Sequence, residues 1–230
     1  MTHVPCLIPT ASSSCSSLLP ETIVAPRPML QEIFAAPGDA SATGLALAQL
    51  PGGEGGSAPL FWVQEARAAG EAGRVFAHGL PPRLRRPVLH VFVRKARDVL
   101  WAMEEGLKCA SLGAVIGELH GNPQALDFTA SRRLAVAAER HGVPAFLVRT
   151  GGHAELSGAR RRWRVESRPS LPHPYDPKAP GAPAWSLDLF RARDMRPGIW
   201  DVGYDPAAHR LDLVPAAGDG AMAERPSRYG

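Results

Sequence analysis

Short apolar runs alternate with helical segments between residues 30 and 150, and this alternation restricts the fold more than any other feature of the chain. Each run has the length and composition of a strand, and those at residues 30–34, 59–65 and 113–119 suit strands buried in a parallel sheet. The predicted strands are residues 30–34, 59–65, 88–93, 113–119 and 143–150. Helices are predicted between them at residues 41–50, 95–109 and 127–141. The pattern predicts an α/β fold with a mostly parallel central sheet flanked by helices.

The two longest helical segments also carry signals of how they begin, end and pack. In residues 95–109, apolar side chains recur at helical spacing and charged side chains occupy the other side. We expect Trp101 and Met103 of this helix to pack in the core; the alternative is a patch that faces a partner. Thr129 is expected to cap the helix at residues 127–141, and Gly142 is expected to end it.

The pattern changes after residue 150. Four segments with apolar residues at every second position predict antiparallel strands that extend one side of the sheet, at residues 159–168, 185–193, 199–205 and 209–214. The proline-rich residues 169–184 are predicted to form an irregular loop. We expect one domain over residues 29–214, with a flexible N-terminal arm (residues 1–28) and a flexible tail (residues 215–230).

Composition and short motifs exclude several classes of function. The net charge of +4 and the pI near 9.3 permit a nucleic-acid partner without requiring one. Three cysteines without pairing or metal-ligand spacing favour a reducing, cytoplasmic location. The eight histidines show no metal-ligand spacing, no nucleophile motif supports a hydrolase, and no apolar run could span a membrane. We therefore expect no metal site and no membrane association.

The segment at residues 30–50 has the strand–loop–helix order of a phosphate-binding loop, in which loop amides and a helix N-terminus converge on one anion. A working loop follows the pattern G-x-x-x-x-G-K-[ST]. Here the glycine positions hold alanine and serine, the lysine position holds alanine, and only the threonine is kept. The residues of this degenerate loop are Ala36, Pro37, Gly38, Ser41, Ala42 and Thr43. The sequence predicts a nucleotide-binding architecture without bound cofactor or ATP hydrolysis; an anion held by the loop amides and Thr43 is the alternative.

Five segments follow one another in a recognisable order: QEIFAAPGDASATGLAL, LFWVQE, RDVLWAMEEGLKC, GAVIGELHG and DFTASRRLAVAAERHGVPAFLVR. This order resembles the RecA-like ATPase core and, within that fold, the ImuA family of bacterial damage-inducible mutagenesis proteins. The resemblance covers about residues 29–214. The most specific of the matching segments is RDVLWAMEEGLK, because nucleotide-binding folds in general do not require this sequence. The C-terminal segments RRRWRV and PAWSLDLFRARDMRPGIW match as well.

The resemblance implies a function that the residues alone do not show. ImuA-type proteins are encoded in SOS-induced cassettes with ImuB, an inactive relative of Y-family polymerases, and with an error-prone polymerase. A non-enzymatic accessory protein of translesion DNA synthesis is implied, with ImuB, RecA or the polymerase complex as partners. Two alternatives stay open: a cryptic RecA-like ATPase that uses Thr43, Glu65 and Lys95, and a SulA-like inhibitor of cell division.

The resemblance also points to two carboxylates at the ends of predicted strands. Glu65 lies where the RecA-like core carries a carboxylate that activates water, and Glu118 lies near its metal-associated aspartate. Carboxylates at the carboxyl ends of parallel strands line the binding crevice of such sheets. The alternative is that both side chains simply cap strands in solvent.

A basic cluster forms the last candidate site, at Arg160, Arg161, Arg162, Trp163 and Arg164. Five arginines and one glutamate give residues 159–168 a charge of 5 − 1 = +4. Arginines beside a tryptophan suit single-stranded DNA, because they combine phosphate contacts with base stacking. In the RecA-like core, the loop at residues 150–158 corresponds to a loop that contacts DNA. A protein contact, or a basic edge strand that discourages aggregation, is the alternative.

Overall fold

A computed structural model describes residues 27–52 and 57–214 of the chain. The strands among these residues form one sheet in the order β3-β2-β4-β5-β1-β6-β7-β8-β9. They are β1 (Leu30–Ala35), β2 (Leu60–Glu65), β3 (Val88–Val93), β4 (Ala114–His120), β5 (Ala145–Thr150), β6 (Arg161–Arg168), β7 (Ala184–Ala192), β8 (Gly198–Asp205) and β9 (Arg210–Leu213). Strands from β3 to β6 in this order pair in parallel, and those from β6 to β9 pair antiparallel. The predicted α/β class is confirmed, with a mostly parallel sheet and an antiparallel extension.

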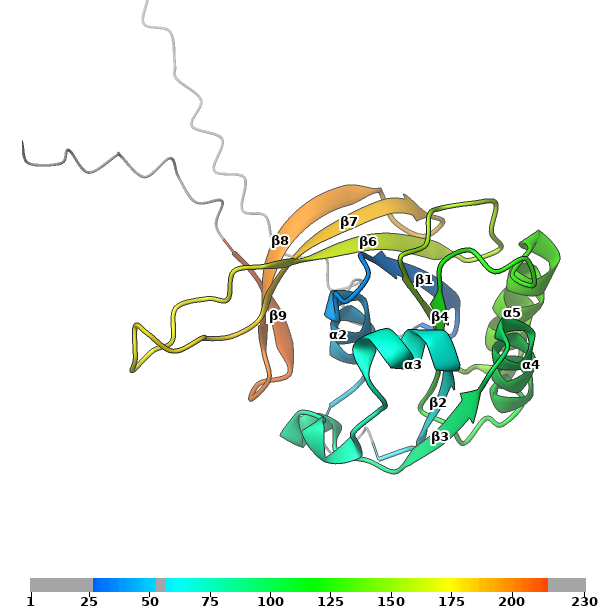
Figure 1. Cartoon of the computed structure of the whole chain (residues 1–230), viewed down its shortest axis with the longest axis horizontal. Coiled ribbons are helices and arrows are strands. Elements are labelled where there is room, and N and C mark those ends of the chain that lie inside the picture. The colour runs from blue at the N-terminus through cyan, green and yellow to red at the C-terminus, as the bar shows by residue number, and fades with distance from the viewer. Residues whose placement is uncertain (1–26, 53–56, 215–230) are drawn as a thin grey trace, which may run out of the picture.

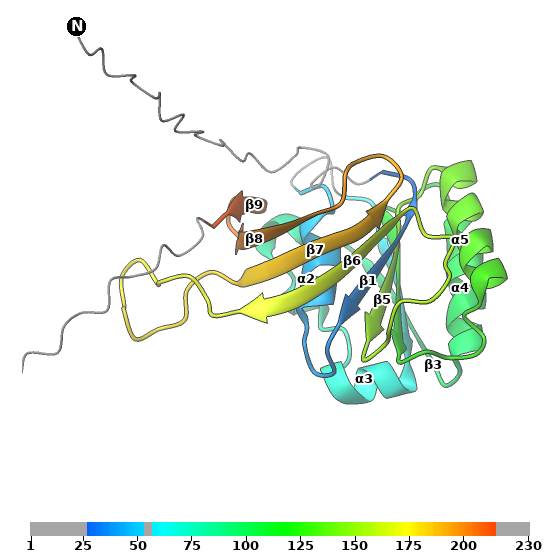
Figure 2. The same ribbon diagram turned by 90° about the horizontal axis from the view of Figure 1, so that it is seen from above.

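Helices cover both faces of the sheet (Figures 1 and 2). One face packs against α2 (Ser41–Ala48), around which the antiparallel strands curl, and the other packs against α4 (Ala96–Leu107) and α5 (Phe128–His141). A short helix, α3 (Ala66–Ala72), and two 3-10 turns (Ala77–Gly79 and Pro82–Leu84) lie between β2 and β3. Each face has its own apolar core, so the central strands are buried on both sides.

Strand β6 joins the parallel and the antiparallel parts of the sheet. It pairs in parallel with β1, from Gln31 opposite Arg161 to Phe34 opposite Arg164, and antiparallel with β7. Its pairing with β7 confirms the expectation that this segment begins the antiparallel extension. Its parallel pairing with β1 was not expected, and the alternative of a basic edge strand is wrong because β6 has a neighbour on each side. Alternation of apolar residues indicates a strand but does not indicate the direction of its neighbours.

Helix α4 buries one of the two large residues that were expected in the core. Val99, Met103 and Leu107 are fully buried, because residues four apart share one helix face. Trp101 lies about 200° around the helix from Met103 and is 64% exposed. The core prediction is confirmed for Met103 and wrong for Trp101.

Helix α5 begins at a different cap from the one expected. The Asp127 carboxylate accepts a hydrogen bond from the Ala130 amide at 2.7 Å, whereas Thr129 is already inside the helix. The expected Thr129 cap is therefore wrong, because a cap must precede the first helical residue. Gly142 ends the helix in the left-handed conformation, at φ 73°, as predicted.

Residues 169–183 connect β6 to β7 without helix or extended strand, apart from an isolated bridge between Pro172 and Pro180. The predicted arm falls outside the described residues up to residue 26, and the predicted tail falls outside them entirely. Within residues 27–52 and 57–214, no helix combines the length and apolarity needed to cross a membrane.

Candidate functional site

The degenerate loop joins β1 to α2 and supplies its own negative charge to the helix. Gly38 takes a left-handed turn at φ 74°, which favours glycine. One Asp39 carboxylate oxygen accepts the Ser41 amide at 2.8 Å, and thereby satisfies one of the free N–H groups at the start of α2. The same side chain accepts the Ser167 amide at 3.0 Å and the Ser167 hydroxyl at 2.7 Å. A carboxylate thus lies at the helix N-terminus to which a phosphate loop would bring its anion.

The charge state of Asp39 follows from these contacts. Burial by itself raises the pKa of Asp39, but the hydrogen bonds from Ser167 and Ser41 outweigh it and lower the pKa below its usual value. Asp39 is therefore ionised near neutral pH. Its negative charge disfavours a second anion at the same helix end.

The positions that would hold the phosphate-binding lysine and glycine are packed into the core. Ala42 is fully buried and Ser41 is 2% exposed. The Ser41 hydroxyl has no hydrogen-bond partner among the described residues. Thr43 is half-buried, and its hydroxyl lies 3.5 Å from a Glu118 oxygen. The first turn of α2 therefore presents no cationic side chain.

Glu118 is the most buried carboxyl group of the predicted site. Its two oxygens accept hydrogen bonds from Trp62 Nε1 at 2.8 Å and from Gln64 Nε2 at 2.7 Å. Burial raises the pKa of Glu118 above that of a solvated glutamate, although the bonds from Gln64, Trp62 and Thr43 oppose the rise. The expectation that this side chain caps its strand in solvent is wrong.

A cavity of about 300 Å³ lies beside Glu118 and Thr43. Its far wall is the segment that follows α3, and Gln64 holds that segment by accepting the Val75 amide at 3.1 Å and donating to the Gly73 carbonyl at 3.2 Å. Lys95, the lysine considered for a cryptic ATPase, is exposed at the start of α4 and does not line this cavity.

Glu65 ends β2 and is tied to the neighbouring strand end. One of its oxygens accepts the His120 amide at 3.0 Å. The His120 ring lies 3.0 Å from a Glu71 oxygen, so Glu71 and Glu65 both contact the last residue of β4. The described residues contain no cluster of three or more histidine, cysteine or acidic side chains that could hold a metal ion.

Three members of the basic cluster are buried. Arg161 and Trp163 have no exposed surface, and Arg162 is 4% exposed. Arg161 donates to both oxygens of Asp194, at 3.0 and 2.6 Å, and Trp163 Nε1 donates to Gln31 at 2.8 Å. Because these three side chains are buried, they present no surface that a nucleic acid could contact. Their role in the folded protein is structural.

The other two members of the cluster reach the surface. Arg164 is exposed, lies 4.2 Å from the centre of the Phe190 ring and pairs with Asp188 at 3.0 Å. Arg160 pairs with Glu139. For Arg160 and Arg164, a contact with single-stranded DNA or a partner stays a prediction.

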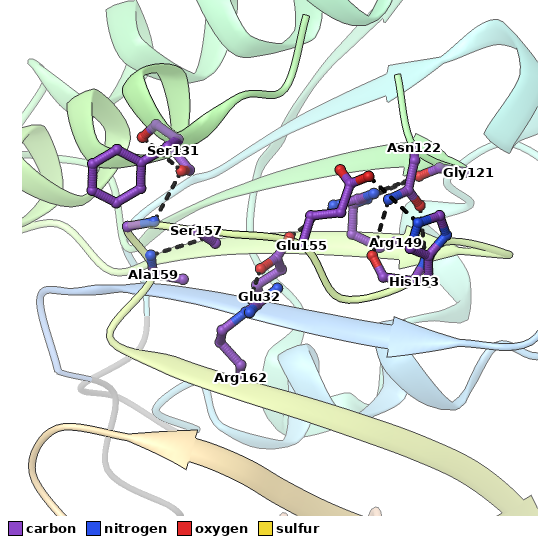
Figure 3. A network of polar contacts seen from close by, with 12 residues as sticks. Glu32, Gly121, Asn122, Ser131, Arg149, His153, Glu155, Ser157, Ala159 and Arg162 are labelled. Atoms are coloured by element: carbon purple, nitrogen blue, oxygen red, sulfur yellow. Dashed lines mark hydrogen bonds and ion pairs between the residues drawn. The ribbon is translucent and has the colours of Figure 1, made fainter. Parts of the chain in front are cut away.

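A buried ion triad links three neighbouring strands (Figure 3). Glu32 of β1 accepts from Arg149 of β5 at 2.8 Å and from Arg162 of β6 at 2.7 Å. Arg149 also donates twice to the Gly121 carbonyl. The two buried arginines are therefore held by one carboxylate and one main-chain oxygen.

The loop that precedes β6 is attached at both ends. Near its start, the Asn122 side chain donates to the His153 carbonyl at 3.0 Å and accepts its amide at 2.8 Å. Near its end, the Ser131 hydroxyl accepts the Gly158 amide at 2.9 Å (Figure 3). These bonds fix the loop that corresponds to the DNA-contacting loop expected from the resemblance.

Comparison with known proteins shows what the chain is similar to. No protein-family model matches the chain. Protein ImuA, from two strains of Caulobacter vibrioides, is 32% identical to it over 158 residues. The chain is therefore similar to the ImuA family over this part of its length. The match covers 62% of this chain and 63% of the ImuA chains, so it spans less than two thirds of these relatives.

Sequence reasoning missed two features of the candidate site, and both had a signal. Asp39 stands two residues before a helix, where a short acidic side chain commonly accepts amides. Glu32 is a charged residue within a strand that is otherwise suited to burial, and a buried charge needs a partner. The identity of the partners, Ser167, Arg149 and Arg162, had no local signal.

Replacement of Glu118 by Gln tests the site through the pH dependence of stability. Because its folded-state pKa is raised, the folded protein holds this proton more tightly than the unfolded chain. The free energy of unfolding should fall as pH rises from the usual glutamate range through the raised pKa, and then level off. E118Q should lack this fall, which urea unfolding between about pH 4 and pH 8 can measure.

The same substitution has a second, pH-independent effect. The Val75 amide fixes the orientation of the Gln64 side chain, so Gln64 donates to one side of residue 118 while Trp62 donates to the other. In E118Q, the side-chain N–H group at residue 118 must therefore face one of these two donors. We expect a cost of about 1–3 kcal/mol. Glu166→Gln, at an exposed position, is the control. Parallel pH profiles for wild type and E118Q would contradict the expectation.

Proposed function

We propose that the protein is a non-enzymatic accessory factor of SOS-induced, error-prone translesion DNA synthesis. It acts through contacts with an ImuB-like polymerase relative, with RecA, or with both, within the error-prone polymerase complex. Similarity to Protein ImuA supports the assignment to the mutagenesis system. The site described above supports a binding role instead of catalysis.

One observation carries the non-enzymatic part of the proposal: the α2 N-terminus holds the carboxylate of Asp39 and no lysine. Phosphoryl transfer depends on positive charge that stabilises the transferring group. Ala42 is buried where that charge would originate, and Glu118 is bonded to Trp62 and Gln64. The α/β core then serves as a rigid frame for partner surfaces.

We expect millimolar MgATP to leave the thermal stability of the protein unchanged. A nucleotide at about 100 times its Kd would add about 2.7 kcal/mol to the free energy of unfolding and raise Tm by several degrees. Differential scanning fluorimetry with and without MgATP measures this, and RecA is the positive control. A saturable rise in Tm would instead support the cryptic ATPase.

Co-purification tests the partners. The tagged chain is mixed with purified ImuB-like protein and with RecA from the same organism, each with and without ATP and single-stranded DNA. Recovery of either protein that does not depend on nucleotide supports the proposal. Nucleotide dependence that persists when RecA is omitted contradicts it, because RecA is then not the ATP-binding component. Recovery of neither protein, with binding to the division tubulin homologue, would favour the SulA-like alternative.

A further inference from the structure

The outer surface of α4 and α5 carries an exposed groove on the side of the sheet opposite α2. The two helices lie side by side, away from the antiparallel strands (Figures 1 and 2). Two cavities of about 210 and 320 Å³ follow one another between them and share Glu104 and Arg133 in their walls. These two residues pair with each other and separate the cavities. We call this surface the α4–α5 groove.

Apolar side chains are exposed along the groove. Trp101 is 64% exposed at one end, and Val136 is 48% exposed near the other. A tryptophan with most of its surface in water is unusual for a helix whose opposite face is well packed. Exposed tryptophans that line a concave surface are frequent anchors of protein–protein interfaces.

The rim of the groove is basic. Its lining includes five basic residues and one acidic residue, which gives 5 − 1 = +4: Arg97, Lys108, Arg132, Arg133, Arg140 and Glu104. Glu104 is itself paired with Arg133. Arg132 and Arg140 are exposed and form no ion pair with any described residue, and they stand eight residues apart with Val136 midway. That spacing places all three on one face of α5.

We propose that the α4–α5 groove binds an acidic amphipathic helix of a protein partner. Its apolar side chains contact Trp101 and Val136, and its carboxylates contact Arg132 and Arg140. From Arg97 to Lys108 the groove runs along about 16 Å of helix, which matches a partner helix of about three turns. This proposal rests on the proposed function, because it supplies the surface through which a mutagenesis partner would bind.

A nucleic acid fits the groove less well than a protein. Single strands bind to successive aromatic platforms, and this groove has one exposed tryptophan followed by aliphatic residues. Alternating basic and apolar positions along one helix face match the carboxylates and apolar side chains of an amphipathic helix. Charge complementarity therefore favours an acidic protein segment.

Binding of a defined peptide tests the groove directly. The probe is a stapled three-turn helix with leucine on one face and glutamate on both flanks, and its control carries lysine in place of every glutamate. We expect the acidic probe to bind the full chain and the lysine probe not to bind. Trp101→Ala should weaken the acidic probe about 30-fold or more, and the pair Arg132→Glu and Arg140→Glu should weaken it at least as much. Binding should fall with added salt.

Matched variants separate the groove from general charge and folding effects. Ile199→Ala removes an equally exposed apolar side chain elsewhere, and Arg67→Glu with Arg196→Glu makes the same change in net charge outside the groove. We expect both to bind the probe as wild type does. Failure of the acidic probe to bind, equal weakening by the control variants, or preferential binding of a single-stranded oligonucleotide at this surface would overturn the proposal.

The same variants separate this inference from the proposed function. If a partner co-purifies with wild type and with the groove variants equally well, the groove proposal fails and the proposed function stands. If no partner is recovered with wild type, the proposed function fails, and probe binding alone decides the groove.

Discussion

Replacement of Glu32 by Gln is expected to lower the free energy of unfolding by about 3–5 kcal/mol. Glu32 is 2% exposed, and each of its oxygens accepts a hydrogen bond from a buried arginine. Removal of its charge leaves Arg149 and Arg162 in a low-dielectric interior without their shared counter-ion, and Glu155 gives Arg149 only a weaker attraction. This loss of stability is larger than the net contribution of either ion pair, because two desolvated arginines lose the same partner.

Urea unfolding at neutral pH measures this loss. Asp188→Asn provides the control, because it removes a carboxylate from the exposed pair with Arg164 and should cost less than about 1 kcal/mol. If E32Q does not accumulate as folded protein, the double variant E32Q/R162M removes one of the two arginine charges that have lost Glu32 and should recover part of the stability. Similar small losses in E32Q and D188N would refute the triad as a structural element.

Replacement of Trp163 by Ala is expected to cost about 3–5 kcal/mol, as a large cavity in a packed core does. The Trp163 ring is fully buried, 6.4 Å from the Trp200 ring between centroids. Its Nε1 group donates to Gln31, which in turn donates to Gln49 at the end of α2. The side chain therefore joins β6, β1 and α2.

The conservative variant separates packing from hydrogen bonding. Trp163→Phe keeps much of the ring but leaves the Gln31 oxygen without its donor, and should cost about 1–3 kcal/mol. A stacking role in single-stranded DNA binding would give the opposite result, with DNA affinity lost and stability kept. Denaturant unfolding and fluorescence anisotropy with a labelled oligonucleotide, on the same variants, distinguish the two roles.

Local patterns in the sequence were sufficient to predict most of the helices and strands. Apolar runs placed β1 to β5, and helical spacing placed α4 and α5, because both signals depend on neighbours a few residues apart. The sequence also shows directly that Ala42 occupies the position of the phosphate-binding lysine. Prediction of the helix cap was weaker, because several nearby residues have side chains that can cap a helix. Thr129 was expected to cap α5, but it stands two residues after the true cap, Asp127.

Predictions about the candidate sites were less accurate, because the environment of a side chain depends on distant segments. The cluster at residues 160–164 was expected at the surface, but the parallel pairing of β6 with β1 places Arg161, Arg162 and Trp163 inside the sheet. Trp101 was expected inside, yet its position on α4 turns it outward. Each outcome was decided by which element lies next to the strand or helix.

The sequence by itself determined an alternating α/β chain, a strand–loop–helix segment without a lysine, and a likeness to ImuA. Only the tertiary structure decided how the remaining charges are held. Asp39 meets Ser167, 128 residues away, and Glu32 meets Arg162, 130 residues away. No local pattern in the sequence predicts such pairs, because they depend on the spatial order of the strands in the sheet, which brings distant segments together.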